Sequence, residues 1–257
     1  MSVAGSFYPA QAQELQRYFK HFEEFSKENG FVLAKKDARA LIVPHAGYIY
    51  SGYTASLAYR ELAQSGIKNI VLLGPSHRSA FEGVSLCSAE RYATPLGTLK
   101  SSKKLYEIFS KEFSLEQKIE HQEHSTEVQL PFLKHYLPSC EVVELVYATL
   151  SYSVLSALIE KALESEDTGV VISTDLSHFY TLEQANRHDS VCLDAVKNLD
   201  IETLSKGCEA CGILGLAAIL DVAKKRGLEA QLLDYRTSAD VSEDTSRVVG
   251  YMSAYLA

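Results

Sequence analysis

The sequence lacks the features of several large protein classes. Its 257 residues contain no apolar run that reaches the roughly 18 residues of a membrane-spanning helix, which argues against a membrane contact. Basic residues are also fewer than acidic ones: the sequence has 25 Lys and Arg and 33 Asp and Glu, which gives a formal net charge of −8. Because nucleic-acid binding requires a clustered basic face, we expect no nucleic-acid partner. The opening segment MSVAGSFYPA has neither the charged region nor the apolar core of a secretory signal.

Cysteines are few and odd in number. Five Cys in 257 residues are too sparse for a small disulfide-stapled domain. A chain of this length buries about three quarters of its unfolded surface without such staples. We therefore expect reduced thiols and a cytoplasmic localisation.

The chain has neither low-complexity linkers nor a fixed-period repeat, so we expect a single domain over residues 1–257. Strand-like runs lie near 39–43, 68–73, 83–88, 141–148, 168–174, 229–235 and 247–255. Helical patterns fit 10–29, 52–65, 101–112, 125–137, 151–164, 180–198 and 208–226. This alternation predicts an α/β fold with a central, mostly parallel or mixed sheet flanked by helices on both faces. Only a polar loop separates the last two runs, which leaves an antiparallel edge open as an alternative there.

Three histidines follow hydrophobic strands. His45, His77 and His178 each stand within a few residues of the end of an aliphatic run. Ligands of an α/β sheet bind outside the carboxyl ends of its strands, so these imidazoles can converge although they lie far apart in sequence. A neutral imidazole is the commonest ligand of transition metals, and the pattern therefore predicts a metal site.

Each of these motifs also has a purely local interpretation. His45, between Pro44 and Gly47, could cap a tight turn by hydrogen bonding. Asp175 binds metal directly, orients an imidazole, or caps the helix that follows it. His178 is a candidate third ligand or general base. Capping and catalysis are compatible, so both interpretations stay open.

Two further segments place reactive groups near helix starts. His124 and Glu127 open a helix, where the hydroxyls between them cap it and Glu127 complements the positive end of the helix dipole. The alternative puts His124 or Glu127 at the rim of the cleft. Cys208 and Cys211 have CxxC spacing, which we interpret as buried structural thiols. Cys208 is alternatively a cleft-lining residue, because helix N-termini and strand ends face the same side of a βαβ unit.

Other catalytic signatures are absent. The sequence contains no GxGxxG, no GxxxxGK[ST], no HExxH and no GxSxG motif. A hydrolase that uses Ser76 or Ser177 beside a histidine is a remote alternative, since triad partners usually come from separate segments. The other histidines occupy polar helix or loop positions where we expect no chemistry: His21, His121, His135 and His188.

Taken together, six motifs in order resemble the Memo family. They are AGSFYP at 4–9, PHAGY at 44–48, GPSH at 74–77, HSTEVQLPFL at 124–133, STDLSH at 173–178 and SRVVGYMSAYL at 246–256. Microbial members of this family are described as component B of the AmmeMemoRadiSam system. The resemblance therefore implies a radical-SAM protein and a third system component as partners.

The resemblance also implies a fold like that of the class III extradiol dioxygenases, which use non-haem Fe(II). By motif, the family's two histidine ligands correspond to His45 and His77, and its neighbouring acid–base pair corresponds to Asp175 and His178. The family's cysteine ligand falls at Val241, which cannot bind a metal, so this site is expected to be weak or empty. Cu and Zn are alternatives to Fe(II).

Two hypotheses of function follow. In the first, the protein is a metal-dependent, dioxygenase-like oxidoreductase of a small substrate, with Asp175, Glu127 or Asp240 supplying an oxygen ligand in place of the cysteine. In the second, the cleft binds a peptide or small ligand without turnover, as part of a complex.

Overall fold

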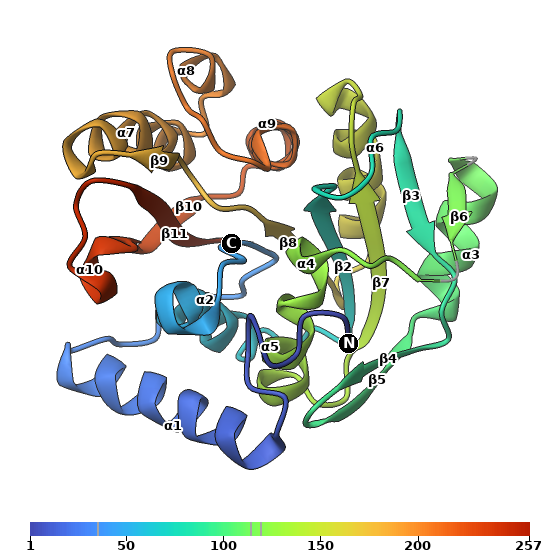
Figure 1. Ribbon diagram of the computed structural model, residues 1–257. Coiled ribbons are helices and arrows are strands. Elements are labelled where there is room, and N and C mark those ends of the chain that lie inside the picture. Colours follow the sequence, from blue (N-terminus) through green and yellow to red (C-terminus); the bar gives the residue numbers. More distant parts are fainter. Residues whose placement is uncertain (35, 114, 119) are drawn as a thin grey trace.

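A curled mixed sheet forms the centre of the computed structural model, which describes residues 1–34, 36–113, 115–118 and 120–257 (Figure 1). Four parallel strands lie side by side in the order β1, β8, β2, β7. Their bounds are β1 (Ala40–Val43), β8 (Thr168–Ser173), β2 (Asn69–Pro75) and β7 (Glu141–Tyr147). Parallel strands present their carboxyl ends at one edge, so the segments that follow β1, β8 and β2 become neighbours.

Antiparallel strands extend this parallel centre on both sides. Strand β11 pairs with β1, and β10 pairs with β11; at the other side β3 pairs with β7 and carries β6. Two short strands, β4 and β5, form a hairpin, and β9 pairs with β11. The bounds are β3 (Val84–Cys87), β4 (Arg91–Thr94), β5 (Gly97–Ser101), β6 (Glu116–Lys118), β9 (His178–Tyr180), β10 (Ala230–Thr237) and β11 (Val248–Leu256).

Helices cover both faces of the sheet because the central strands are apolar on both sides. In β1, Leu41 packs into the cluster under one set of helices, whereas the next residue, Ile42, packs into the opposite cluster. The first face carries α1 (Ala12–Glu28), α2 (Tyr48–Leu62) and α5 (Gln129–Tyr136). The second face carries α3 (Lys103–Glu112), α6 (Tyr152–Leu163), α7 (Leu182–Asn198) and α9 (Ile213–Arg226). Continuous hydrophobic runs are typical of such doubly covered strands.

The predicted α/β fold, with a mixed sheet and helices on both faces, is confirmed. The C-terminal edge is antiparallel, and its polar loop contains the short helix α10 (Ala239–Ser242). The helix expected over 125–137 is instead two helices, α4 (His124–Glu127) and α5, which meet at Val128. The short elements β4, β5, β6, β9 and α8 (Ile201–Leu204) were not predicted, because each is too short and too polar to show a hydrophobic pattern.

One expectation about the cysteines is wrong. Cys192 in α7 and Cys208, just before α9, form a disulfide with Cα atoms 4.9 Å apart. The two segments pack together in the core, which brings thiols separated by 16 residues into bonding distance. Cys87, Cys140 and Cys211 are outside disulfides. Within the described ranges, no helix has the length and apolar character needed to cross a membrane.

Candidate metal centre

The ends of three neighbouring strands place His45, His77 and Asp175 together. The ring centroids of His45 and His77 are 5.2 Å apart. The Asp175 carboxylate accepts a hydrogen bond from the backbone N–H of His45 at 2.7 Å, and its second oxygen lies 3.9 Å from Nε2 of that imidazole. Residues more than a hundred positions apart thus share one point at the edge of the sheet.

The tautomer of His45 follows from the hydrogen bonds of Ser173. The Ser173 hydroxyl donates its single proton to the carbonyl of Ser125 and accepts from the amide of Gln129 at 2.8 Å. Its 2.9 Å contact with Nδ1 of His45 is therefore a bond in which the imidazole donates. The proton sits on Nδ1, and the lone pair of Nε2 is directed away from Ser173.

Burial keeps the His45 ring neutral. The residue is 1% exposed, and its burial lowers the pKa to about 4, an effect that the charge of Asp175 opposes and the neighbouring His77 and His124 reinforce. A neutral imidazole with one free nitrogen is the form that binds metal ions.

Glu123 holds two more imidazoles in the same way. One carboxylate oxygen lies 3.0 Å from Nδ1 of His77 and 3.0 Å from Nδ1 of His124. The other accepts from the backbone N–H of His77 at 2.7 Å. A carboxylate can only accept, so both rings carry their proton on Nδ1 and leave Nε2 free.

The carboxylate of Glu123 stays ionised although it is buried. Burial alone would raise its pKa, but the hydrogen bonds from His124, His77 and Ser125 outweigh that effect and hold the pKa far below its usual range. The ring centroids of His124 lie 4.4 Å from His77 and 5.3 Å from His45. Three Nδ1-anchored imidazoles therefore form one cluster, and the side chain of His77 is 30% exposed toward solvent.

Gly74 lets α4 approach closely enough for this arrangement. The Ser125 hydroxyl donates to the carbonyl of Pro75 at 2.8 Å. A Cβ at position 74 would lie 2.6 Å from that hydroxyl oxygen and 2.7 Å from a methyl carbon of Thr126. The glycine of the GPSH motif thus serves the packing of α4 on β2, which brings Glu123 and His124 next to His77.

A thiol completes the cluster. Sγ of Cys211 lies 3.4 Å from Nε2 of His45. The backbone N–H of Asp175 donates to that sulfur at 3.3 Å, and the N–H of Cys211 donates to the carbonyl of Asp175 at 3.2 Å. Burial, followed by the charge of Asp175, raises the pKa of the thiol to about 12. The possible ligand atoms of His45, His77 and Cys211 all lie within 4.8 Å of one another, which makes these three residues a candidate set of metal ligands.

The close approach of Cys211 depends on the next residue. A Cβ on Gly212 would lie 2.7 Å from Cβ of Thr174 and 3.0 Å from the carbonyl oxygen of Ser173. Only glycine allows the start of α9 to sit against the end of β8 at this distance.

The other residues singled out in the sequence make contacts outside this donor cluster. His178 is in β9, where its ring contacts Phe179. Glu127 accepts hydrogen bonds from Ser2, Val3 and Tyr8, so it anchors the N-terminal segment. Cys208 is bonded to Cys192 in a disulfide and has no free thiol for the cleft.

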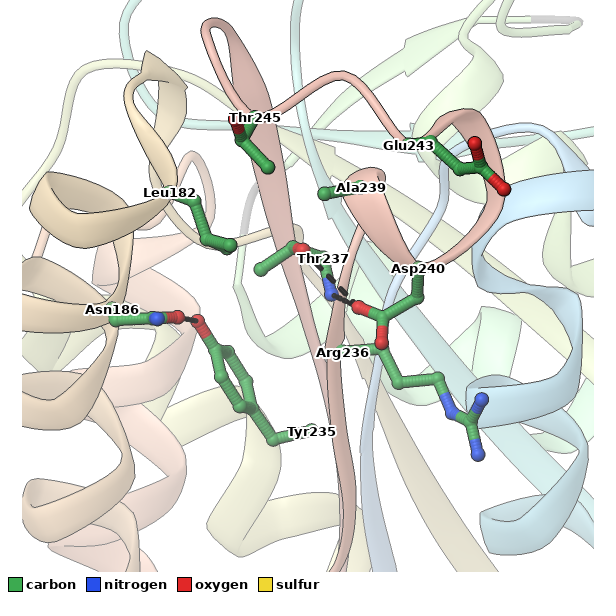
Figure 2. Close-up of a pocket in the computed structure, with 9 residues that line it drawn as sticks. All are labelled: Leu182, Asn186, Tyr235, Arg236, Thr237, Ala239, Asp240, Glu243 and Thr245. Carbon is green, nitrogen blue, oxygen red and sulfur yellow. Dashed lines mark hydrogen bonds between the residues drawn. The ribbon is translucent and has the colours of Figure 1, made fainter.

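The residues around Val241, where the sequence resemblance places the family's cysteine, form a separate surface. Figure 2 shows the Asp240 carboxylate bound to Thr237, whose N–H and hydroxyl donate to it at 2.8 and 3.1 Å. Val241 follows in α10 and is 44% exposed. The hydroxyl of Ser76, considered for a hydrolase, donates to the carbonyl of Ser79 at 2.7 Å.

Comparison with known proteins identifies the family. The profile described as Memo-like protein matches residues 1–255. The chain belongs to the Memo-like family. It is 32% identical over 263 residues to a MEMO1 family protein of Aquifex aeolicus, with 98% of this chain and 96% of the relative covered. It is 34% identical over 265 residues to one of Methanosarcina acetivorans, with 97% and 96% covered.

A solved structure supports the fold alone. An uncharacterized protein of Escherichia coli K12, JW3007, superposes with a TM-score of 0.55 at 11% identity, over 85% of this chain and 99% of that one. Within this Memo-like chain, the thiol beside the two histidines comes from Cys211, which the sequence analysis assigned to the core. The usable signal was the Cys-Gly step at a helix start, which faces the same sheet edge as the strand ends.

Proposed function

We propose that this Memo-like protein binds a divalent transition metal ion through His45, His77 and Cys211. The observation that carries the proposal is the shared orientation of the imidazoles: each Nδ1 is held by a hydrogen-bond acceptor and each Nε2 is left free. Metal-binding histidines are held in this way by their second nitrogen. Without an ion, the Cys211 thiol is within reach to donate to Nε2 of His45, so proton and metal compete for the same lone pairs.

The identity of the third ligand determines the metal class. Two imidazoles with a thiolate favour zinc or copper, whereas two imidazoles with a carboxylate favour non-haem Fe(II). Cys211 lies in the donor cluster, while one oxygen of Asp175 is already engaged by the His45 N–H. The arrangement therefore supports the thiolate set more strongly, and Asp175 acts beside it as a charge that favours the bound cation.

The protein groups around the ion suit metal-assisted redox chemistry on a small substrate, as in a dioxygenase-like cleft. The bound metal would supply Lewis-acid or redox chemistry. His124 has a free Nε2 and a Nδ1–H that donates to the ionised Glu123. We propose His124 as a proton acceptor beside the ligands, with Asp175 and His178 as further acid–base groups of the cleft.

Metal content tests this proposal. Wild-type protein and the His45→Ala and His77→Ala variants are loaded with Zn²⁺ or, anaerobically, with Fe²⁺, dialysed, and analysed for bound metal. We expect each variant to retain about one equivalent less than wild type. Equal metal content in all three proteins would refute the site. The Cys211→Ser variant distinguishes a thiolate from a carboxylate as the third ligand, because loss of the thiolate should weaken the binding of Zn²⁺ more than the binding of Fe²⁺.

A second candidate function is ligand or protein binding without turnover. Three exposed apolar side chains, Ile49 (57%), Tyr50 (39%) and Val241 (44%), line one pocket together with Phe25 and Tyr53. This aromatic surface begins four residues after His45, at the start of α2. It suits a peptide or a small apolar ligand, or a contact with a radical-SAM protein and a third component of one complex.

Co-purification with these components distinguishes the two functions. Binding that survives in the His45→Ala/His77→Ala double variant but is lost in Tyr50→Ala would support the interaction surface. Binding that depends on the two histidines would assign it to the metal centre.

A further inference from the structure

A second cluster of metal-binding residue types lies away from the His45 centre. Cys87 ends β3, Glu144 lies in the middle of β7, and His121 precedes α4. Their ligand atoms all fall within 4.8 Å of one another. The cluster shares no residue with the His45, His77 and Cys211 set. Its members come from three separate segments of the chain, so tertiary structure alone brings them together.

The Glu144 side chain is 6% exposed on a central strand. The hydroxyl of Thr126 donates to one of its oxygens at 2.6 Å. The same oxygen lies 3.3 Å from Nδ1 of His121, whose side chain is 5% exposed. A carboxylate taken from water needs an opposite charge or several hydrogen bonds to offset its lost hydration.

His121 is positioned as a metal ligand rather than as a hydrogen-bond donor. Its Nε2 lies 2.9 Å from the hydroxyl oxygen of Ser85, which fixes the ring. Its Nδ1 is buried and has no hydrogen-bond partner among the described residues, although it faces Glu144. A nitrogen that faces a carboxylate outside hydrogen-bond geometry leaves room for a cation between them. The held second nitrogen is the usual arrangement for a metal-binding histidine.

The spacing and chemistry of the donors suit zinc. Bonds of about 2.0–2.1 Å to nitrogen and oxygen and about 2.3 Å to sulfur place tetrahedral ligand atoms roughly 3.3–3.6 Å apart. The 3.3 Å between His121 Nδ1 and the Glu144 oxygen falls in this range. The thiol of Cys87 is hydrogen-bonded to the side chains of Glu144 and Tyr92. A thiolate, an imidazole and a carboxylate together form a donor set that zinc accepts.

We propose that Cys87, His121 and Glu144 form a second, buried zinc site that ties the loop before α4 to strands β3 and β7. The ion would supply a positive charge beside the buried Glu144 carboxylate. It would also fix the segment leading into α4, the helix that begins at His124. The site is independent of the proposed function, because removal of the first metal centre leaves all three of its ligands in place.

The test uses a parent protein that lacks the first centre. The His77→Ala/Cys211→Ser variant removes a member of each other donor group and the thiol beside His45. Into this parent, Cys87→Ser is introduced, with Cys140→Ser as the matched control, since Cys140 is equally outside a disulfide and is 4% exposed. Each protein is titrated with Zn²⁺ against a chelator and with Co²⁺, whose thiolate complex has a charge-transfer absorption.

We expect the parent and the Cys140→Ser control to bind one equivalent of zinc and to show the cobalt–thiolate absorption. Cys87→Ser should lose the absorption and weaken zinc binding more than about tenfold, since even the groups that only orient a ligand change affinity by 10–100-fold. Zinc-free parent protein, or unchanged zinc binding in Cys87→Ser, would overturn the proposal and leave a hydrogen-bonded cluster. If Cys87→Ser does not fold, Glu144→Gln replaces it. Zinc binding by the parent protein tests the proposal in either case.

Discussion

Replacement of Glu123 by Gln perturbs the two imidazoles that its carboxylate holds. The carboxylate accepts from Nδ1 of His77, Nδ1 of His124 and the backbone N–H of His77, at 3.0, 3.0 and 2.7 Å. In Gln, one of the two oxygens becomes an NH₂ group that can only donate, so at least one of these N–H groups would face another donor. The orienting charge is lost as well.

The expected loss is 10–100-fold in metal affinity, or about 1.4–2.8 kcal/mol, the usual effect of removing a group that orients a histidine ligand. Isothermal titration with Zn²⁺ measures it. The matched control is Glu127→Gln, on the first turn of α4. It removes the same charge, but the native Glu127 carboxylate binds Ser2, Val3 and Tyr8 rather than the imidazoles. That variant should lower thermal stability and leave metal affinity within about twofold. Wild-type affinity in Glu123→Gln, or equal losses in both variants, would refute the reasoning.

Three further predictions concern stability. Gly212→Ala places a Cβ 2.7 Å from Cβ of Thr174. We therefore expect the free energy of unfolding, measured in urea, to fall by about 1–3 kcal/mol, and metal binding to weaken. If neither quantity changes, the proposed close packing is contradicted. Since burial lowers the pKa of His45 to about 4 from 6.5, the unfolded chain takes up a proton that the folded protein excludes. In the metal-free protein, His45 should therefore lower the free energy of unfolding by about 3 kcal/mol as the pH falls from about 6.5 to about 4. The stability of the His45→Gln variant should depend less steeply on pH over the same range. The disulfide between Cys192 and Cys208 joins residues 16 positions apart. Under non-reducing conditions, the Cys192→Ala/Cys208→Ala variant should therefore be less stable to unfolding by about 3 kcal/mol, while its zinc affinity is retained.

The strand ends were predictable because each is marked by local chemistry. Long aliphatic runs end at Pro44, Pro75 and Asp175, and a parallel sheet has no other place for the polar residues that follow. The Glu123 anchor was missed, although it stands only two residues before the helix predicted over 125–137. Its role depends on how closely α4 packs on Gly74, and that distance is a tertiary property.

The cysteine was misassigned for a similar reason. Cys208 and Cys211 are three positions apart in the segment before α9, and sequence spacing cannot tell which of them faces the sheet edge. The partner of Cys208 lies 16 residues earlier in α7, and this pairing leaves Cys211 toward His45. The antiparallel strands β10 and β11 were identified as a departure from the alternating pattern, because only a polar loop separates them.

Anomalous diffraction from crystals grown with Zn²⁺ and measured at the zinc edge tests the central claim most directly. We expect a peak within about 2.0–2.3 Å of Nε2 of His45, Nε2 of His77 and Sγ of Cys211. A zinc-loaded crystal without a peak among these three atoms would contradict it.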